Sequence, residues 1–458
     1  MTAIIVTMLL LAYVLIATGH LTGVNKAAIA MFLGTVGWVV YVCWGADFVM
    51  DRHPQEYLEW LGGATATSET VKHFIYHNVF LYYVGRAAAI VMFLLATMAI
   101  VELLANNGCF DFITEWIRTR NSKRLLWTIT LATFILSANL DNLTTATMML
   151  VIMHNILQNS RQRMYVGSAI VLAANCGGCF TVIGDPTGLI LWGDGAVTAS
   201  RFSAYLFLPA ILAWVVPTVL INRELPARLD TAWNPSPYRG DGTRLNRWQR
   251  VVMLIVGIGG LWFIPTFHNI TKLAPFLGAL CVLSVLWVVN EAFNRKLISS
   301  DQTTQRSIPM SLQYGALQQV LFVMGIMLGM GVVTETGVWS DVADWMDTYV
   351  HDIWLIGIGA GLLSCVVDTF TIAISNISLY QVGVGEVGTN GAYWSVIAYT
   401  TAVGGCLLSV GSVSGLALMR AEHVRLGWYV KHLTPKVLLG WLVGYVVLWV
   451  EINMFNII

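Results

Sequence analysis

The apolar positions of the chain gather in continuous runs of about 20 residues, separated by short polar stretches. A helix rises about 1.5 Å per residue, so about 20 residues are enough to cross the roughly 30 Å of hydrocarbon in a membrane. The pattern therefore predicts ten membrane crossings. They lie at 2–19, 27–46, 79–105, 164–195, 203–222, 250–267, 272–292, 313–335, 391–420 and 435–455.

Two further apolar stretches, 124–158 and 353–383, are interrupted midway by polar residues. Each arm has only about 15 residues, and a helix of that length spans about 22 Å, which is too short for a full crossing. Both stretches are therefore predicted to be re-entrant hairpins, which enter and leave the membrane on one side. Short amphipathic segments, 110–119 and 338–350, precede them and are expected to be interfacial linkers.

The composition agrees with a membrane protein. Apolar residues make up 57% of the 458 positions and charged residues 11%, whereas roughly a quarter of the residues in soluble domains are charged. The formal net charge is zero, so nucleic acid is not expected as a partner. The sequence has no zinc-ligand histidine pair, nucleophile elbow or phosphate-binding loop, so neither enzymatic activity nor a cofactor is expected.

Basic residues predict the sidedness, because cytoplasmic loops are enriched in Lys and Arg. Both ends of the first hairpin carry them: Arg118, Arg120, Lys123 and Arg124 before it, and Arg161 and Arg163 after it. The first hairpin is therefore predicted to open to the cytoplasm of a bacterial inner membrane. With this anchor, 20 of the 25 Lys and Arg residues lie on the cytoplasmic side, and both termini lie in the periplasm.

The second hairpin has the opposite flanks. No Lys or Arg occurs between Arg306 and Arg420, whereas acidic residues surround the hairpin: Asp341, Asp344, Asp347, Asp352 and Glu386. This hairpin is therefore predicted to enter from the periplasm. Two similar hairpins that enter from opposite faces are what an inverted-topology repeat requires.

The two halves of the chain also match residue by residue. The segment from Ser137 to Thr144 aligns with the segment from Ser364 to Thr371, at an offset of 227 positions. The same offset brings together further pairs: Gly177 with Gly404, Gly178 with Gly405, Cys179 with Cys406, Gly184 with Gly411, and Gly188 with Gly415. The predicted fold is an all-α polytopic membrane protein of two inverted-topology repeats, each with a re-entrant hairpin and a discontinuous transmembrane helix.

This repeat predicts the organisation of the chain. Residues 1–222 hold the N-terminal helices and the first repeat, whose discontinuous helix is 164–195. Residues 223–249 form a cytoplasmic loop. Residues 250–458 form the second repeat, whose discontinuous helix is 391–420.

Three carboxylates fall deep in the predicted membrane, where a charged side chain costs several kcal/mol unless it meets a cavity, a partner or an ion. Asp141 and Asp368 lie at the two hairpin tips, and Asp185 lies in the first discontinuous helix. Neutral oxygen donors surround them: Ser137, Asn142, Thr144, Thr145, Asn175, Thr181, Ser364, Thr369, Thr371, Ser409 and Ser412. Carboxylate, amide and hydroxyl oxygens are the ligands of hard cations.

Glycines explain how backbone oxygens become available as well. Six of them interrupt the two discontinuous helices: Gly177, Gly178, Gly184, Gly404, Gly405 and Gly411. Unwound backbone at membrane depth is tolerated where it lines a cavity or an ion site. The halves differ chemically, because Ser412 stands where the first half has Asp185, and only the first half has a proline, Pro186. A capping role is the alternative for each carboxylate, above all for Asp185, because Asp-Pro often starts a helix.

These motifs resemble the ion transporter superfamily and, within it, the NhaD-type sodium/proton antiporters. In the first half the resemblance rests on Ser137-Ala138, Leu140-Asp141-Asn142-Leu143-Thr144-Thr145, Ala174-Asn175-Cys176-Gly177-Gly178 and Ile183-Gly184-Asp185. In the second half it rests on Ala398-Tyr399, Gly404-Gly405 and Val410-Gly411-Ser412. The sequence departs from this pattern at Asp368-Thr369, where NhaD-type proteins typically have Asp-Asn. The proline after Asp185, Pro186, is a feature that also resembles relatives with other substrates.

The resemblance implies an elevator-type carrier in which hairpin tips and discontinuous helices form one cation site, exposed to each side in turn. It implies Na⁺ or Li⁺ and protons as the transported ions, with Asp141, Asn142, Thr144 and Asp368 as the expected Na⁺ ligands. It also implies a homodimer. Asp141 is expected to be the carboxylate that binds either Na⁺ or a proton, with Asp368 and Asp185 next.

Two alternatives to an antiporter follow from the same sequence. One is a sodium-coupled symporter of an organic or inorganic anion, the other main activity of the superfamily. Acidic residues at the site disfavour it, because an anion carrier would place neutral groups and helix N-termini against its substrate. The other is a membrane-embedded enzyme, which the missing catalytic motifs disfavour.

Overall fold

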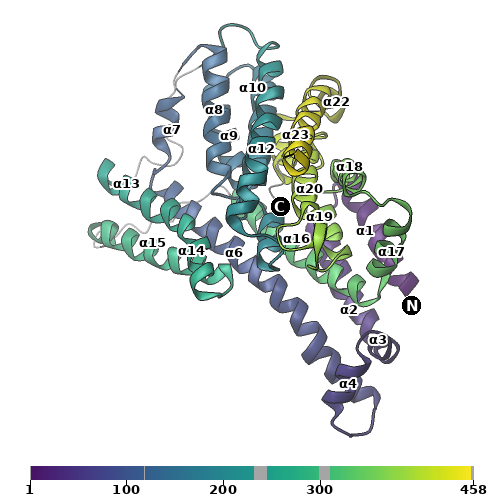
Figure 1. Ribbon diagram of the computed structural model, residues 1–458. Coiled ribbons are helices and arrows are strands. Elements are labelled where there is room, and N and C mark those ends of the chain that lie inside the picture. Colours follow the sequence, from purple (N-terminus) through teal and green to yellow (C-terminus); the bar gives the residue numbers. More distant parts are fainter. Residues whose placement is uncertain (1, 118, 232–244, 299–309, 455–458) are drawn as a thin grey trace.

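The computed structural model describes residues 2–117, 119–231, 245–298 and 310–454, and this part of the chain is helical with no β-strand (Figure 1). Eight helical segments are long and apolar enough to cross a membrane: Thr2–Gly19, Lys26–Cys43, Ser68–Asn106, Ala199–Asn222, Arg247–Thr271, Pro275–Phe293, Leu317–Glu335 and Thr434–Met454. They coincide with eight of the ten predicted crossings. The chain is therefore a multi-pass membrane protein, as its sequence predicts.

Most of these segments belong to single helices: α1 (Thr2–Thr22), α2 (Lys26–Cys43), α12 (Ala199–Asn222), α15 (Pro275–Ile298), α16 (Met310–Glu335) and α23 (Thr434–Met454). Two segments contain a π-helical stretch in the middle. The first comprises α5 (Ser68–Phe74), η1 (Ile75–Phe80) and α6 (Leu81–Asn106), and the second comprises α13 (Arg247–Leu254), η2 (Ile255–Gly259) and α14 (Gly260–Thr271).

Both predicted hairpins form as pairs of short helices. The first pairs α8 (Ser122–Ser137) with α9 (Asn142–Ile156), and the second pairs α18 (Ile353–Ser364) with α19 (Thr369–Leu379). A side-chain oxygen caps the start of each helix by accepting backbone N–H groups, and the capping residues are Asn121, Asp141, Asp352 and Asp368. The polar interruptions in the sequence are therefore the turns between the arms.

Both predicted discontinuous helices are broken, and the breaks contain Gly184, Gly405 and Gly411, whereas Gly177, Gly178 and Gly404 lie in the last turn of the helix before each break. The first consists of α10 (Ser160–Cys179) and α11 (Pro186–Gly193), and the second of α20 (Ala392–Gly404) and α21 (Val413–Glu422). A Cβ atom on Gly177 would lie 2.3 Å from the carbonyl oxygen of Phe134, and one on Gly404 would lie 2.5 Å from that of Gly361. Each glycine thus lets its broken helix touch the backbone of the first hairpin arm in its own half.

Hydrogen bonds show which ends of these elements meet. At one end, Glu422 of α21 accepts a hydrogen bond from Nε of Arg163 at 2.6 Å, beside the open end of the first hairpin. At the other end, the backbone N–H of Asn390, just before α20, donates to the carbonyl of Ala196, just after α11, at 2.7 Å. The two broken helices therefore run in opposite directions. This arrangement is what an inverted repeat requires, and the inversion itself stays a prediction.

The remaining described elements are short: α3 (Gly45–Arg52), α4 (Pro54–Leu61), α7 (Asp111–Trp116), α17 (Val338–Tyr349), η3 (Gly385–Val387) and α22 (Leu426–His432). Helices α7 and α17 match the two amphipathic linkers predicted before the hairpins. The sequence patterns did not predict α3 to α5, which form the narrow projection at the lower right of Figure 1. The predicted cytoplasmic loop 223–249 lies partly outside the described residues.

The long helices sort into two groups by their packing. An outer group consists of α1, α2, α6, α14, α15 and α16, in which α2 packs along α16 and α6 packs along α15 and α16. A hairpin bundle consists of α8 to α12, α18 to α21 and α23, in which α12 packs along α23 and each broken helix packs on its hairpin. In Figure 1 the first hairpin and α10 stand upright beside α12, and α13 to α15 extend to one side.

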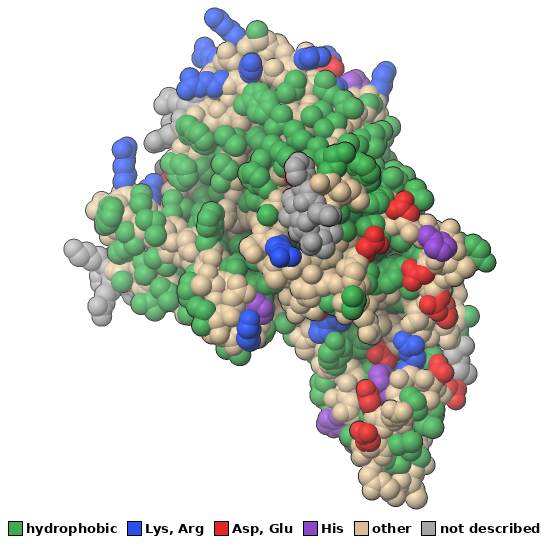
Figure 2. Space-filling model, viewed as in Figure 1, with side chains coloured by type: hydrophobic (Ala, Val, Ile, Leu, Met, Phe, Trp, Pro, Cys, Tyr) green, Lys and Arg blue, Asp and Glu red, His purple; other side chains and the backbone are tan. Residues whose placement is uncertain are grey.

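Charged side chains gather at opposite ends of the molecule. Figure 2 shows Lys and Arg side chains mostly at the end where the first hairpin opens, and Asp and Glu side chains mostly over α17 and the projection. Between them the visible surface is largely hydrophobic. An apolar belt between a basic and an acidic end is the surface expected of a protein that crosses a membrane.

Candidate functional site

The first candidate carboxylate, Asp141, is buried at the tip of the first hairpin. Its Oδ2 atom accepts hydrogen bonds from the backbone nitrogen and the hydroxyl of Thr144, both at 3.0 Å, and so caps α9. Its Oδ1 atom accepts a hydrogen bond from Nε2 of Gln319 on α16 at 3.1 Å. The two oxygens of Asp141 thus have separate partners, one within the hairpin and one in the outer group.

The second carboxylate, Asp185, is buried at the start of α11. The amide nitrogen of Asn142 donates to Oδ1 of Asp185 at 3.3 Å and to Oδ1 of Asn175 at 3.2 Å. The hydroxyl of Ser414, on α21, donates to the same Asn175 oxygen at 3.2 Å. Asn142 and Asn175 therefore link the first hairpin, both parts of the first broken helix and the second half of the chain.

A small cavity of about 20 Å³ lies where the two hairpin tips meet. Its lining includes Asn142 from the first tip, Thr369 from the second tip, Asp185 from the first broken helix, and Gln319 and Phe322 from α16. A cavity of this size accommodates about one water-sized particle. Amide, hydroxyl and carboxylate oxygens around so small a space are suited to a single small cation.

The third carboxylate, Asp368, is fully buried at the tip of the second hairpin. Its Oδ2 atom caps α19 by accepting the backbone nitrogens of Phe370 at 3.2 Å and Thr371 at 3.5 Å. Its Oδ1 atom lies 3.4 Å from Nζ of Lys26, at the start of α2. Asp368 is therefore paired with a cation that belongs to the protein.

Three of the predicted oxygen ligands are engaged in bonds that hold the hairpins to the broken helices. The hydroxyls of Ser137 and Thr181 donate to the carbonyls of Ala174 and Ala138, each at 2.6 Å. Ser364 donates to the carbonyl of Thr401 at 2.9 Å. Each of these bonds joins a hairpin to the broken helix of its own half, so these three hydroxyls hold the site's surroundings together in this structure.

The other predicted hydroxyl ligands differ in their surroundings, and Thr369 lines the cavity. Ser412 accepts the backbone nitrogen of Gly415 at 3.1 Å and caps α21. The hydroxyls of Thr145, Thr371 and Ser409 are buried without a hydrogen-bond partner in the described part of the chain. Buried polar groups usually have partners, so three such hydroxyls near the hairpin tips mark a region equipped for a ligand. The role of each residue as an ion ligand stays a prediction.

Sequence reasoning missed Gln319 and Lys26. Gln319 is the second of two glutamines in an otherwise apolar stretch of α16, and a polar pair at that depth was the available signal. Lys26 stands at the start of an apolar run, where the positive-inside rule counts it as a cytoplasmic residue. Both belong to helices far from the hairpins in sequence, so only the tertiary structure shows what they touch.

Paired hairpins, two broken helices and buried carboxylates around a cation-sized cavity define a membrane transport protein. The chain belongs to the citrate transporter family (CitMHS), whose model matches residues 1–404. The description of this family as a transporter agrees with the multi-pass fold described above.

Characterised relatives and a solved structure extend this finding. The chain is 30% identical to sodium/proton antiporter 1 of Arabidopsis thaliana over 79% of its own length and 61% of that protein's. It is 27% identical to the Na⁺/H⁺ antiporter NhaD of Vibrio cholerae over 83% of its own length and 81% of that protein's. The fold is similar to that of the YdaH transporter of Alcanivorax borkumensis, with a TM-score of 0.60, 13% identity and coverage of 94% of this chain and 99% of that one.

Proposed function

We propose that this protein is a sodium/proton antiporter of a bacterial inner membrane, which exchanges Na⁺ or Li⁺ for H⁺. The observation that carries the proposal is the cavity lined by Asp185, Asn142 and Gln319. Gln319 also donates a hydrogen bond to Asp141, which connects this carboxylate to the cavity lining. The printed names of the Arabidopsis and Vibrio relatives support the same activity.

Competition at the carboxylates would couple the two fluxes. A buried carboxylate is stable when it is protonated or when a cation lies beside it, and it is costly when it is ionised and alone. Na⁺ and H⁺ therefore stabilise the same group in mutually exclusive ways. Asp141, which accepts a hydrogen bond from Gln319, and Asp185, which accepts one from Asn142, are the proposed proton-exchanging pair.

We also propose an elevator-type alternating-access mechanism in which the hairpin bundle moves against the outer group. The contacts between the two groups at the hairpin tips include three polar pairs, which are Gln319 with Asp141, Lys26 with Asp368, and Trp262 with Asn139. The ring contact between Phe322 and Phe370 lies beside them, and the pair of Arg86 and Asp194 lies further out. Water or other polar groups can replace the partners of a polar pair when one group slides. The homodimer stays a prediction from the resemblance.

Anion symport is the second candidate, because the description of the family names citrate. The cavity of about 20 Å³ is small for a tricarboxylate, and the buried carboxylates beside it would repel one. These two observations favour the antiporter.

Everted membrane vesicles distinguish the two functions. After respiration has built a pH gradient, addition of Na⁺ or Li⁺ is expected to collapse it, and K⁺ serves as the comparison ion. Uptake of labelled citrate in the presence of a Na⁺ gradient is measured in parallel. Citrate uptake without collapse of the pH gradient would refute the antiporter function and support the symporter function.

A further inference from the structure

The environment of Lys26 differs from that of an ordinary surface lysine. Its Nζ atom lies 3.4 Å from three oxygens: Oδ1 of Asp368, the carbonyl of Val367 and the carbonyl of Val410. The side chain of Lys26 is 15% exposed and that of Asp368 is fully buried. An ammonium group has three N–H donors and no acceptor, so three oxygens satisfy it completely.

The three oxygens come from the segments that ion sites of this architecture use. Val367 and Asp368 form the tip of the second hairpin, and Val410 lies in the unwound stretch of the second broken helix. A carboxylate combined with unwound backbone carbonyls is a ligand set for Na⁺. The ammonium of Lys26 therefore sits where a monovalent cation would be expected.

The corresponding position in the first half lacks a charged donor. At the offset of 227 residues, Asp368 corresponds to Asp141. The Oδ1 atom of Asp141 accepts a hydrogen bond from the neutral amide of Gln319, where Asp368 has the ammonium of Lys26. The first half also has Asp185 where the second half has Ser412. The first half thus combines two carboxylates with neutral donors, whereas the second combines one carboxylate with a lysine.

We propose that Lys26 is a built-in cation that fills the second ion position of the repeat, so that Na⁺ binds only on the Asp141–Asp185 side. This inference deepens the proposed function and rests on it for the identity of the transported ion. Two buried hydroxyls on the same segments, those of Thr371 and Ser409, have no partner in the described part of the chain. They are oxygen ligands that a second Na⁺ could use if Lys26 were absent.

Charge and position favour this role over a simple tether. Asp368 is fully buried, so in the absence of a cation it would be protonated or would destabilise the hairpin tip. Lys26 is the first residue of α2 in the outer group, and Asn25 caps that helix, so the lysine is anchored outside the hairpin bundle. In the conformation that the structure shows, the cation at the second position therefore belongs to the protein.

Equilibrium binding of ²²Na⁺ to the purified full-length protein, measured at about pH 9 so that carboxylates are ionised, tests the inference. Wild-type protein is expected to bind about one Na⁺ per chain, and Lys26→Ala about two. Lys26→Arg, which keeps the positive charge, is expected to bind as the wild type does. The additional site of Lys26→Ala should disappear again in the Lys26→Ala/Asp368→Asn double variant.

A second variant keeps the test decisive if Lys26→Ala fails to fold. Lys26→Gln removes the charge and gives Asp368 a neutral amide, as Gln319 gives Asp141, so this variant is also expected to bind about two Na⁺. Two ions bound by the wild type, or only one ion bound by a folded Lys26→Ala or Lys26→Gln protein, would each overturn the inference.

Failure of the inference can be told from failure of the proposed function. If vesicles show no antiport but Lys26→Ala still binds one Na⁺ more than the wild type, the role of Lys26 as a built-in cation is supported and the antiporter function is refuted. If neither protein binds Na⁺, both proposals are wrong.

Discussion

At the scale of single residues, each hairpin-tip aspartate does two tasks at once. One oxygen of Asp141 and one of Asp368 cap the helix that follows, and the other oxygen meets a side chain from the outer group. The capping alternative raised by the sequence is thus observed for Asp141 and Asp368, whereas Asp185, for which the sequence favoured it most, makes no side-chain cap. The roles of the three carboxylates as ion ligands stay predictions. A carboxylate that caps with one oxygen still has the other available for a cation or a proton.

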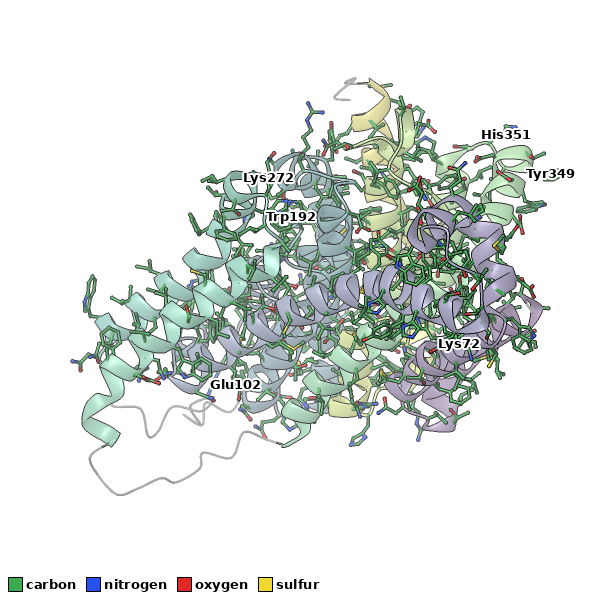
Figure 3. All side chains as sticks on the ribbon, turned by 90° about the horizontal axis from the view of Figure 1, so that it is seen from below. Lys72, Glu102, Trp192, Lys272, Tyr349 and His351 are labelled. Carbon is green, nitrogen blue, oxygen red and sulfur yellow. The ribbon has the colours of Figure 1, made fainter. Side chains whose placement is uncertain are left out.

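Asp141→Asn is expected to reduce Na⁺-driven collapse of the pH gradient below about a tenth of the wild-type rate, because asparagine keeps the shape and loses both the charge and the proton. Glu102→Gln on α6 is the control and should retain most of the activity. Figure 3 shows Glu102 toward the end of the outer group that lies away from Lys72. A wild-type apparent affinity for Na⁺ in a normally inserted Asp141→Asn protein would refute the role of Asp141 in proton exchange. If activity is lost in Asp185→Asn and not in Asp141→Asn, the proton-exchanging carboxylate is Asp185.

Gln319→Ala is expected to raise the apparent half-saturation concentration for Na⁺ about threefold to tenfold, because it removes the amide that orients Oδ1 of Asp141. The neighbouring Gln318 is half-buried, so Gln318→Ala is a matched control that should leave the Na⁺ dependence unchanged. Equal effects of the two substitutions in vesicle titrations would show that Gln319 acts through α16 and not through Asp141.

At the scale of elements, the hairpins and broken helices follow directly from the sequence, and their contacts do not. Polar residues and glycines within apolar runs are local signals, so the positions of the tips and breaks could be predicted to within a few residues. Which outer helix faces each tip depends on packing between segments hundreds of positions apart, as Gln319 and Lys26 show. The helical projection before α6 was missed because its short helices lack a membrane-length apolar run.

Cysteine labelling tests the predicted orientation of the hairpins, and the structure improves the choice of positions. Cys43 and Cys281 are the exposed cysteines of the described residues and are first replaced by serine. Lys123→Cys and Arg161→Cys flank the first hairpin at exposed positions, and His351→Cys and Gln381→Cys flank the second. The end of α17 that leads to the second hairpin, with Tyr349 and His351, is labelled in Figure 3.

The first pair is expected to react with an impermeant thiol reagent from the cytoplasmic side, and the second pair from the periplasmic side. The basic flanks of the first hairpin and the acidic flanks of the second are the physical reason. Reaction of Lys123→Cys and Arg161→Cys from opposite sides would refute the hairpin, and reaction of all four from one side would refute the inverted repeat.

At the scale of the whole molecule, a charge cluster joins the projection to the outer group. The two ring nitrogens of His53 lie 2.9 Å from a carboxylate oxygen of Glu56 and 2.8 Å from one of Glu335. Tyr83 donates to Oε1 of Glu335 at 2.7 Å, and Tyr41 donates at 3.5 Å to Oε2, the oxygen that faces His53. An imidazole can donate to two carboxylates at once only when it is protonated.

The hydrogen bond to Glu335 raises the pKa of His53 above its ordinary value, against the opposing effect of burial, and Glu56 raises it further. A raised pKa in the folded state adds stability that is complete below about pH 6.5 and is lost as the pH rises through the folded value. The melting temperature of His53→Gln is therefore expected to lie about 2 °C below that of the wild type at pH 6, and to match it near pH 9. His73→Gln, at an exposed histidine outside this cluster, is the comparison variant. A constant gap between the two curves would contradict the protonated bridge.

The opposite courses of the two broken helices have a mechanical consequence. Each starts beside the open end of its own hairpin and finishes near the open end of the other, where Glu422 bonds to Arg163 and Asn390 bonds to Ala196. These two bonds join the broken helices to each other, and each broken helix packs along its own hairpin. If the hairpin bundle moves as proposed, this packing makes both hairpins move together as one rigid body, with the transported ion enclosed between their tips.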